Sequence, residues 1–252
     1  MAIFSHQRHH WAYVWIPIAG AFLWFATLWA LLITWLASGR PHYVSMDPDQ
    51  HIAFISDVAA DILKPLFITI CSITGVAFVL CLVFERYLRH SGRLMPNMRT
   101  RERVFSSLAI LGSAIGGAGL ILLSIFDTKR HPTLHDVFLL VFIVGVALSA
   151  IFSIVEFRWI SKDFQYHRLL KRSYWMKAIV AGILIILAVA FAITEFTNVN
   201  VGAVLEWTIA FGYTFFLLTF YYDLRQSKGV HKGELSADRI NNSRRYRMRQ
   251  AV

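Results

Sequence analysis

Val104–Phe126 reads VFSSLAILGSAIGGAGLILLSIF and contains no charged residue. Five further stretches of the chain are similarly apolar: Trp11–Ala37, Pro65–Phe84, Val137–Val155, Ala178–Thr194 and Val199–Tyr222. A helix needs roughly 20 residues, at a rise of about 1.5 Å each, to cross a hydrocarbon core about 30 Å thick. The sequence therefore predicts an all-α, polytopic membrane protein with six transmembrane helices.

The composition of the whole chain favours the same class. Hydrophobic residues make up 57% of the 252 residues, and the mean hydropathy is +0.54, which is high for a soluble domain. We expect one transmembrane domain over residues 1–225 and a basic, partly disordered tail over residues 226–252. The helices are expected at about 11–37, 63–86, 104–126, 134–159, 174–196 and 199–222.

Basic residues are distributed unevenly between the loops. About twenty Lys and Arg lie in the N-terminal tail, in the loops after the second and fourth apolar runs, and in the C-terminal tail; only four lie in or beside the other loops. By the positive-inside rule, this asymmetry predicts that both termini are cytoplasmic.

The net charge of +10 suggests an anionic partner. Because the basic residues sit at membrane edges, we expect anionic lipid headgroups there, worth about 1 kcal/mol per residue, and no nucleic acid. The alternative is that these residues only fix the topology. The predicted lipid-contacting residues are Arg86, Arg89, Arg99, Arg101, Arg103, Arg168, Lys171, Arg172, Arg244 and Arg245.

Small residues mark one face of the Val104–Phe126 run. Gly112 and Gly116 are four residues apart, and Ser113 and Gly117 form the adjacent stripe. Such faces let helix backbones approach closely in lipid. Packing within the chain is the preferred interpretation, and dimerisation is the alternative.

A few charged and polar residues interrupt the apolar runs in the half of the membrane opposite the basic loops. A charge at the bilayer centre costs at least about 2.5–3.5 kcal/mol, so such residues usually face the protein interior and have a partner. We predict that Asp57, His135 and Glu206 form one polar cluster, with Lys64 or His135 as the partner of Glu206. The cluster serves either as a helix-packing ion pair or as a pocket for a lipid headgroup. Its predicted members are Ser56, Asp57, Asp61, Lys64, His135 and Glu206.

Catalysis and transport are weaker interpretations. His131 and His135 have the spacing of zinc ligands on a helix, but Pro132 between them places the helix start after His131. No nucleophile motif is evident, and the apolar runs show no inverted repeat typical of transporters. We expect no catalytic residue, no metal site and no cofactor.

Several short motifs resemble those of a known family. Ile55–Ala60, followed by Pro65, is similar to the Ile-Ser-Asp-x-Gly-Ala segment and proline of the DRAM/Frag/Sfk family of six-helix membrane proteins. His135 fits that family, as do Val204–Trp207, which resembles its Leu-Glu-Trp segment, and Thr219–Asp223 at the end of the last run. The resemblance covers nearly the whole chain.

The resemblance implies a non-enzymatic regulator or scaffold of membrane lipid homeostasis. It implies a role in recruiting a peripheral phosphatidylinositol 4-kinase complex or in lipid asymmetry, with the plasma membrane as the expected location. The alternatives are an autophagy modulator of the lysosome or vacuole, or a factor of the Golgi or endoplasmic reticulum that remodels the lipid of GPI anchors by hydrolase- or acyltransferase-like chemistry. Ala59 departs from the family pattern, which commonly has glycine there.

Overall fold

The computed structural model describes residues 12–163 and 168–240, and within these the chain is all-helical. Six helices are long and apolar enough to cross a membrane, which confirms the predicted fold class. The elements are η1 (Ala12–Val14), α1 (Trp15–Ala37), α2 (Ile55–Ala59), α3 (Lys64–His90), α4 (Thr100–Ile125), α5 (Pro132–Asp163), α6 (Arg168–Thr197) and α7 (Val199–Arg225).

Helix boundaries follow local signals. α3 has Pro65 in its first turn, and α5 begins at Pro132, where the missing N–H leaves no hydrogen bond unmade. The side chain of Asn198 caps α7 by accepting a hydrogen bond from Val201 N at 3.2 Å. Gly92 has a φ of 67°, so the chain turns sharply after α3.

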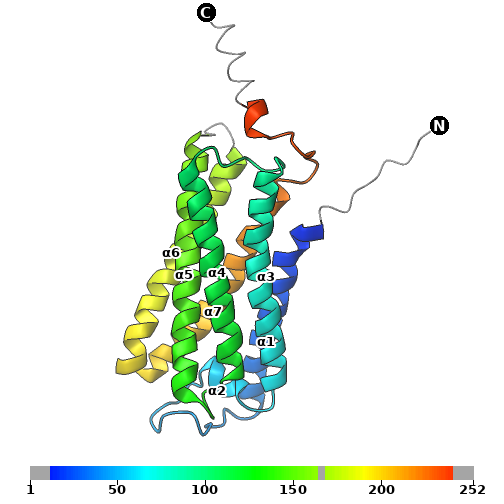
Figure 1. Ribbon diagram of the computed structural model, residues 1–252. Helices are drawn as coiled ribbons and strands as arrows, with labels where there is room; N and C mark the ends of the chain where they lie inside the picture. Colours follow the sequence, from blue (N-terminus) through cyan, green and yellow to red (C-terminus); the bar gives the residue numbers. More distant parts are fainter. Residues whose placement is uncertain (1–11, 164–167, 241–252) are drawn as a thin grey trace, which may run out of the picture.

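The long helices form a ring in the order α1, α3, α4, α5, α6, α7, and α7 returns to α1 (Figure 1). The short helix α2 lies at one end of this bundle, which we call the α2 end. Residues 12 and 240, the first and last described, lie toward the opposite end, which we call the termini end. The segment after α7 packs there, since Gly233 N and Leu235 N donate to Ser91 O at 2.9 Å and Gly92 O at 2.8 Å.

α4 and α5 make the closest helix pair in the bundle. A Cβ added to Gly145 of α5 would lie 2.5 Å from Gly116 N, and one added to Gly112 of α4 would lie 2.9 Å from Ser149 N. Gly117 faces the other way and meets Gly75 of α3. The prediction that the small-residue face packs within the chain is confirmed, because α4 lies between α3 and α5.

α5 and α6 make the loosest contact between neighbours in the ring. Figure 1 shows that α6 leans away from α5 toward the α2 end. The two helices therefore diverge in the half of the bundle where the polar cluster was predicted.

Candidate functional site

Asp57 is buried at the α2 end, where its carboxylate organises the loop before α2. It accepts hydrogen bonds from Ser45 Oγ at 2.6 Å, Gln50 Nε2 at 3.2 Å and Phe54 N at 2.9 Å. Both carboxylate oxygens are thus used within the chain.

Glu206 joins the same loop from α7. Its Oε2 accepts a hydrogen bond from Ile55 N at 2.7 Å, and the neighbouring Trp207 donates from Nε1 to Ala53 O at 2.9 Å. The structure therefore brings Asp57 and Glu206 together around the first turn of α2. The Leu-Glu-Trp segment holds the loop against α7.

The remaining predicted members lie elsewhere. Lys64 pairs with Asp127 rather than with Glu206, and Arg130 Nη1 lies 2.9 Å from the same carboxylate. His135 is buried, and its Nδ1 lies 3.0 Å from both Leu123 O and Phe126 O at the end of α4. The expected partners of Glu206 are thus engaged by α4 and the loop after it.

Within the described residues, the side chains of Ser56 and Asp61 make no hydrogen bond or ion pair with this cluster. Ser56 is half-buried within α2, and Asp61 is exposed in the turn before α3, where its carbonyl accepts from Lys64 N at 3.1 Å. Within the described residues, no group of three or more His, Cys, Asp or Glu could hold a metal ion.

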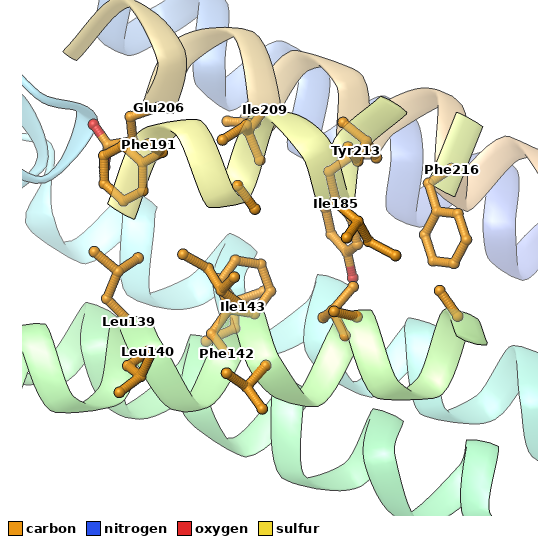
Figure 2. A pocket seen from close by; sticks show the side chains of 18 of the residues that line it. Leu139, Leu140, Phe142, Ile143, Ile185, Phe191, Glu206, Ile209, Tyr213 and Phe216 are labelled. Atoms are coloured by element: carbon orange, nitrogen blue, oxygen red, sulfur yellow. The ribbon is translucent and has the colours of Figure 1, made fainter. Parts of the chain in front are cut away.

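An apolar cavity of about 370 Å³ opens beside Glu206. Figure 2 shows Leu139 and Ile143 of α5 facing Ile209 and Tyr213 of α7 across it, with Glu206 at one end. This volume falls in the range of small-molecule sites, on the order of 300–1,000 Å³. We call this cavity the α5–α6 groove. Its lining residues are mostly aliphatic or aromatic: Trp24, Ile55, Phe67, Leu120, Leu123, Leu139, Leu140, Phe142, Ile143, Val144, Val146, Ala147, Leu148, Ala150, Ala181, Leu184, Ile185, Ala188, Val189, Phe191, Ala192, Glu206, Ile209, Ala210, Tyr213 and Phe216.

The groove runs along the helices and opens sideways. Along α7 its lining extends from Glu206 to Phe216, or roughly 15 Å at a rise of about 1.5 Å per residue, which is about half the thickness of a hydrocarbon core. On its rim, Leu140 of α5 is 61% exposed and Val189 of α6 is 58% exposed. Because these apolar side chains face outward between diverging helices, the groove opens toward lipid.

Among the described residues, Glu206 is the one carboxylate that lines the groove. The other polar groups there belong to Trp24 and Tyr213: Trp24 Nε1 donates to Ala210 O at 2.8 Å, and the Tyr213 hydroxyl lies near the thiols of Cys71 and Cys81 on α3. The described lining of the groove is therefore apolar except for Trp24 and Tyr213 and for one acidic group, Glu206, near the α2 end.

A second set of buried charges lies at the termini end. Lys177 of α6 is fully buried; its Nζ lies 2.5 Å from Asp223 Oδ2 on α7 and 3.8 Å from Glu85 Oε2 on α3. Arg89 Nη2 lies 2.8 Å from Glu85 Oε1, and Arg89 Nε lies 3.6 Å from Glu156 Oε1 on α5. We call these five residues the ion network.

The cations of the ion network also lie over aromatic rings. Lys177 Nζ is 4.0 Å from the centroid of Phe220 and 4.6 Å from that of Phe157, and Arg89 Cζ is 4.7 Å from that of Phe157. Ser173 Oγ donates to Asp223, and Asn97 Nδ2 donates to Glu156 at 3.1 Å. Such pairing compensates the cost of removing the charges from water.

Sequence reasoning missed most of the ion network. Glu85, Lys177 and Asp223 lie directly after or before apolar runs, so none of them was singled out as a charge within the membrane. The available signal was that charges of opposite sign sit at the same depth on three runs.

Arg89 is a correction to the predicted lipid-contacting set. It is 5% exposed, and it binds Glu85 and the Met95 carbonyl, with its Nη1 2.9 Å from Met95 O. A buried guanidinium that already has partners is not available to a headgroup. Of the other predicted residues, Arg244 and Arg245 lie outside the described residues; those that are exposed at the termini end are Arg86, Arg99, Arg101, Arg103, Arg168, Lys171 and Arg172.

Comparison with known proteins identifies relatives of this chain. Residues 12–227 match the family described as Frag1/DRAM/Sfk1/Cwh43P N-terminal domain. Protein sfk1 of Schizosaccharomyces pombe is 29% identical over 222 residues, covering 87% of this chain and 66% of the relative. Protein SFK1 of Saccharomyces cerevisiae is 29% identical over 177 residues, covering 59% of this chain and 49% of the relative.

A human relative is also similar. The DNA damage-regulated autophagy modulator protein 1 of Homo sapiens is 26% identical over 136 residues, covering 48% of this chain and 56% of the relative. The alignments thus span 49% to 66% of the length of these three relatives. No solved structure matches the chain.

Proposed function

Since this chain belongs to the Frag1/DRAM/Sfk1/Cwh43P N-terminal domain family, we propose that it is a non-enzymatic membrane protein that regulates membrane lipid homeostasis. The observation that carries the proposal is the α5–α6 groove, which is apolar, open at its rim and about as long as one leaflet is thick. A protein that holds a lipid chain in such a groove can change the amount of that lipid in one leaflet.

We propose a binding rather than a catalytic role for the groove. Hydrolysis needs a nucleophile with a base in hydrogen-bond reach, and the described residues that line the groove include one carboxylate, Glu206, without such a partner. An aliphatic lining suits retention of a hydrocarbon chain. A lipid-remodelling enzyme is the competing interpretation, and a conversion of lipid by the purified chain would favour it.

We propose that the termini end faces the cytoplasm. The exposed arginines and lysines there are the support, because basic residues favour the cytoplasmic side and its anionic lipids. A peripheral phosphatidylinositol 4-kinase complex, implied by the resemblance to the family, is the proposed partner at this surface. The plasma membrane is the proposed location, and the name of the human relative keeps a role in autophagy as the alternative.

The function is tested by filling the groove. Ala188 lines it from α6, so Ala188→Phe places an aromatic ring in the space proposed for the lipid chain. In cells that depend on this protein, we expect Ala188→Phe to abolish most of its effect on the distribution of fluorescent lipids between leaflets. The measurement is the fraction of probe quenched from outside the cell.

Ile186→Phe is the matched control. Ile186 lies on the same helix, is 70% exposed and does not line the groove, so this variant should retain the activity of the parent. Both variants must unfold at the temperature of the parent chain. Normal lipid distribution with a folded Ala188→Phe variant would contradict the proposed function.

A further inference from the structure

Three carboxyl groups lie toward the α2 end of α5, α6 and α7, the helices beside the α5–α6 groove, and one of them, Glu206, lines it. Glu206 lines the groove from α7, Glu195 lies near the end of α6, and Asp136 lies one turn into α5. Glu206 and Glu195 are within electrostatic range of each other, as are Glu195 and Asp136. Together they make the mouth of the groove acidic.

No cation of the described chain compensates these carboxylates. None of the three takes part in an ion pair among residues 12–163 and 168–240. Lys64 and Arg130 both bind Asp127, and Lys129 is exposed in the loop before α5 and forms no ion pair with the three carboxyl groups. Like charges near one another and near lipid are costly without a counter-ion.

The free oxygen of Glu206 also indicates a missing partner. Oε2 accepts from Ile55 N at 2.7 Å, whereas Oε1 accepts no hydrogen bond from any described residue. Asp57 differs from Glu206 in this respect, because both of its carboxylate oxygens accept hydrogen bonds within the chain. Glu206 is therefore fixed in place by the backbone of α2 and keeps one acceptor for a ligand at the groove.

The chemistry of the mouth restricts the headgroup. Carboxylates accept hydrogen bonds and attract cations, and an ammonium group carries three donors and a positive charge. A phosphate or a fatty-acid carboxylate would be repelled by the same groups. The groove behind the mouth is a single channel about 15 Å long, which suits one hydrocarbon chain.

We propose that the α5–α6 groove binds a single-chain lipid amine, with its alkyl chain in the apolar channel and its ammonium group on Glu206, assisted by Glu195 and Asp136. A sphingoid base has this chemistry. The inference rests on the proposed function, which it deepens by naming the ligand class. It also gives Glu206 a role distinct from that of Asp57, which holds the loop.

The test compares three photoactivatable probes of equal chain length in phosphatidylcholine vesicles that contain the purified full-length chain. The probes are a long-chain amine, the corresponding alcohol and the corresponding fatty acid. We expect the amine to label peptides of α5, α6 and α7 most strongly, and the fatty acid least strongly. Equal labelling by the amine and the fatty acid would overturn the inference.

Glu206→Gln isolates the charge. The amide oxygen of glutamine still accepts the hydrogen bond from Ile55 N, so the loop stays anchored while the negative charge is removed. We expect labelling by the amine to fall about tenfold, as for the loss of one charge-assisted hydrogen bond, and labelling by the alcohol to stay unchanged. Unchanged amine labelling in a folded Glu206→Gln variant would also overturn the inference.

Two further variants keep the result interpretable. Glu195→Gln should reduce amine labelling severalfold, and it provides the test if Glu206→Gln fails to fold. Asp61→Asn changes an exposed carboxylate that does not line the groove and should have no effect.

A groove that binds all three probes equally would refute the ligand class and leave the proposed function standing. Selective amine binding combined with normal cellular lipid distribution in Ala188→Phe would refute the proposed function instead.

Discussion

Both ends of the helix bundle contain buried carboxylates, but the two ends support them differently. At the termini end, Glu85, Glu156 and Asp223 are matched by the cations Arg89 and Lys177. At the α2 end, Glu206 has only a backbone N–H as its donor. The comparison shows that burial of a charge alone does not indicate a ligand site. What distinguishes the groove is that the carboxyl group of Glu206 is held in place by a backbone N–H and has no cationic partner among the described residues.

The ion network connects helices that are far apart in the sequence. Glu85 is on α3, Glu156 on α5, Lys177 on α6 and Asp223 on α7, so four of the six long helices meet at this point. The network fixes the termini end of the ring, where α6 stays close to its neighbours. At the α2 end, by contrast, α6 lacks such a tie to α5 and the groove opens.

The largest expected effect breaks the ion network. Lys177→Met removes the cation between Asp223 and Glu85 and leaves buried carboxylates uncompensated. We expect a loss of about 3–5 kcal/mol in the free energy of unfolding. The measurement is thermal or denaturant unfolding of the purified chain in detergent. Glu206→Gln, which removes a charge but keeps its hydrogen bond, should cost much less.

A double variant sharpens the test. Lys177→Met with Asp223→Asn removes one charge of each sign, so it should recover part of the stability lost in Lys177→Met alone. Equal destabilisation by Glu206→Gln and Lys177→Met would contradict the distinction between the ion network, whose charges are paired, and Glu206, which has no cationic partner among the described residues.

The contrast extends to the two sides of α5. One side meets α4, where a Cβ on Gly145 would lie 2.5 Å from Gly116 N. The other side faces α6 across the groove. Gly182 of α6 has no atom within 4 Å of an added Cβ. The same substitution at Gly145 and at Gly182 therefore probes tight and open packing in one molecule.

We expect Gly145→Ala to destabilise the chain by about 1–3 kcal/mol, because a methyl group there must push α4 and α5 apart. Gly182→Ala should be neutral or stabilising by up to about 1 kcal/mol, since alanine favours the helix and meets nothing. The unfolding temperatures of the two variants check this. Equal destabilisation by both would mean that α4–α5 contact is no closer than the rest of the bundle.

Sequence patterns predicted the helices and the close approach of α4 to its neighbours. An uncharged run such as Val104–Phe126 can satisfy its backbone in lipid only as a helix, so its structure follows from local chemistry. Gly112 and Gly116 were similarly informative, because four-residue spacing on a helix marks one face. The depth of a residue in the membrane and the helix face on which it lies can both be derived from the sequence of a single helix.

The partners of buried charges were less predictable. Lys64 was expected near Glu206 because both lie at a similar depth, yet it pairs with Asp127 on the loop after α4. Depth does not say in which direction around the ring a side chain points. The groove was not predicted as a channel either, because it arises from the divergence of α5 and α6 rather than from either sequence alone.

The smallest expected effect concerns the cluster of Lys64, Asp127 and Arg130, which is a compensated site at the same end as the groove. Burial alone would raise the pKa of Asp127, but hydrogen bonds from Lys64 and Arg130 outweigh it and lower the pKa from 3.8 to about 2. Because the folded-state pKa is depressed, the ionised carboxylate stabilises the fold above about pH 4. That contribution is lost as the pH falls from about 4 to about 2.

We expect this loss to be about 1 kcal/mol, since Arg130 is 58% exposed and its attraction is screened by water. The unfolding temperature of the parent chain should fall over that pH window, and Asp127→Asn should flatten the fall while lowering stability at neutral pH. Asp61→Asn, an exposed change at the same end, should follow the parent curve. An Asp127→Asn variant with the parent's full acid sensitivity would show that this carboxylate is not held by its cations, and that the α2 end contains no compensated counterpart to Glu206.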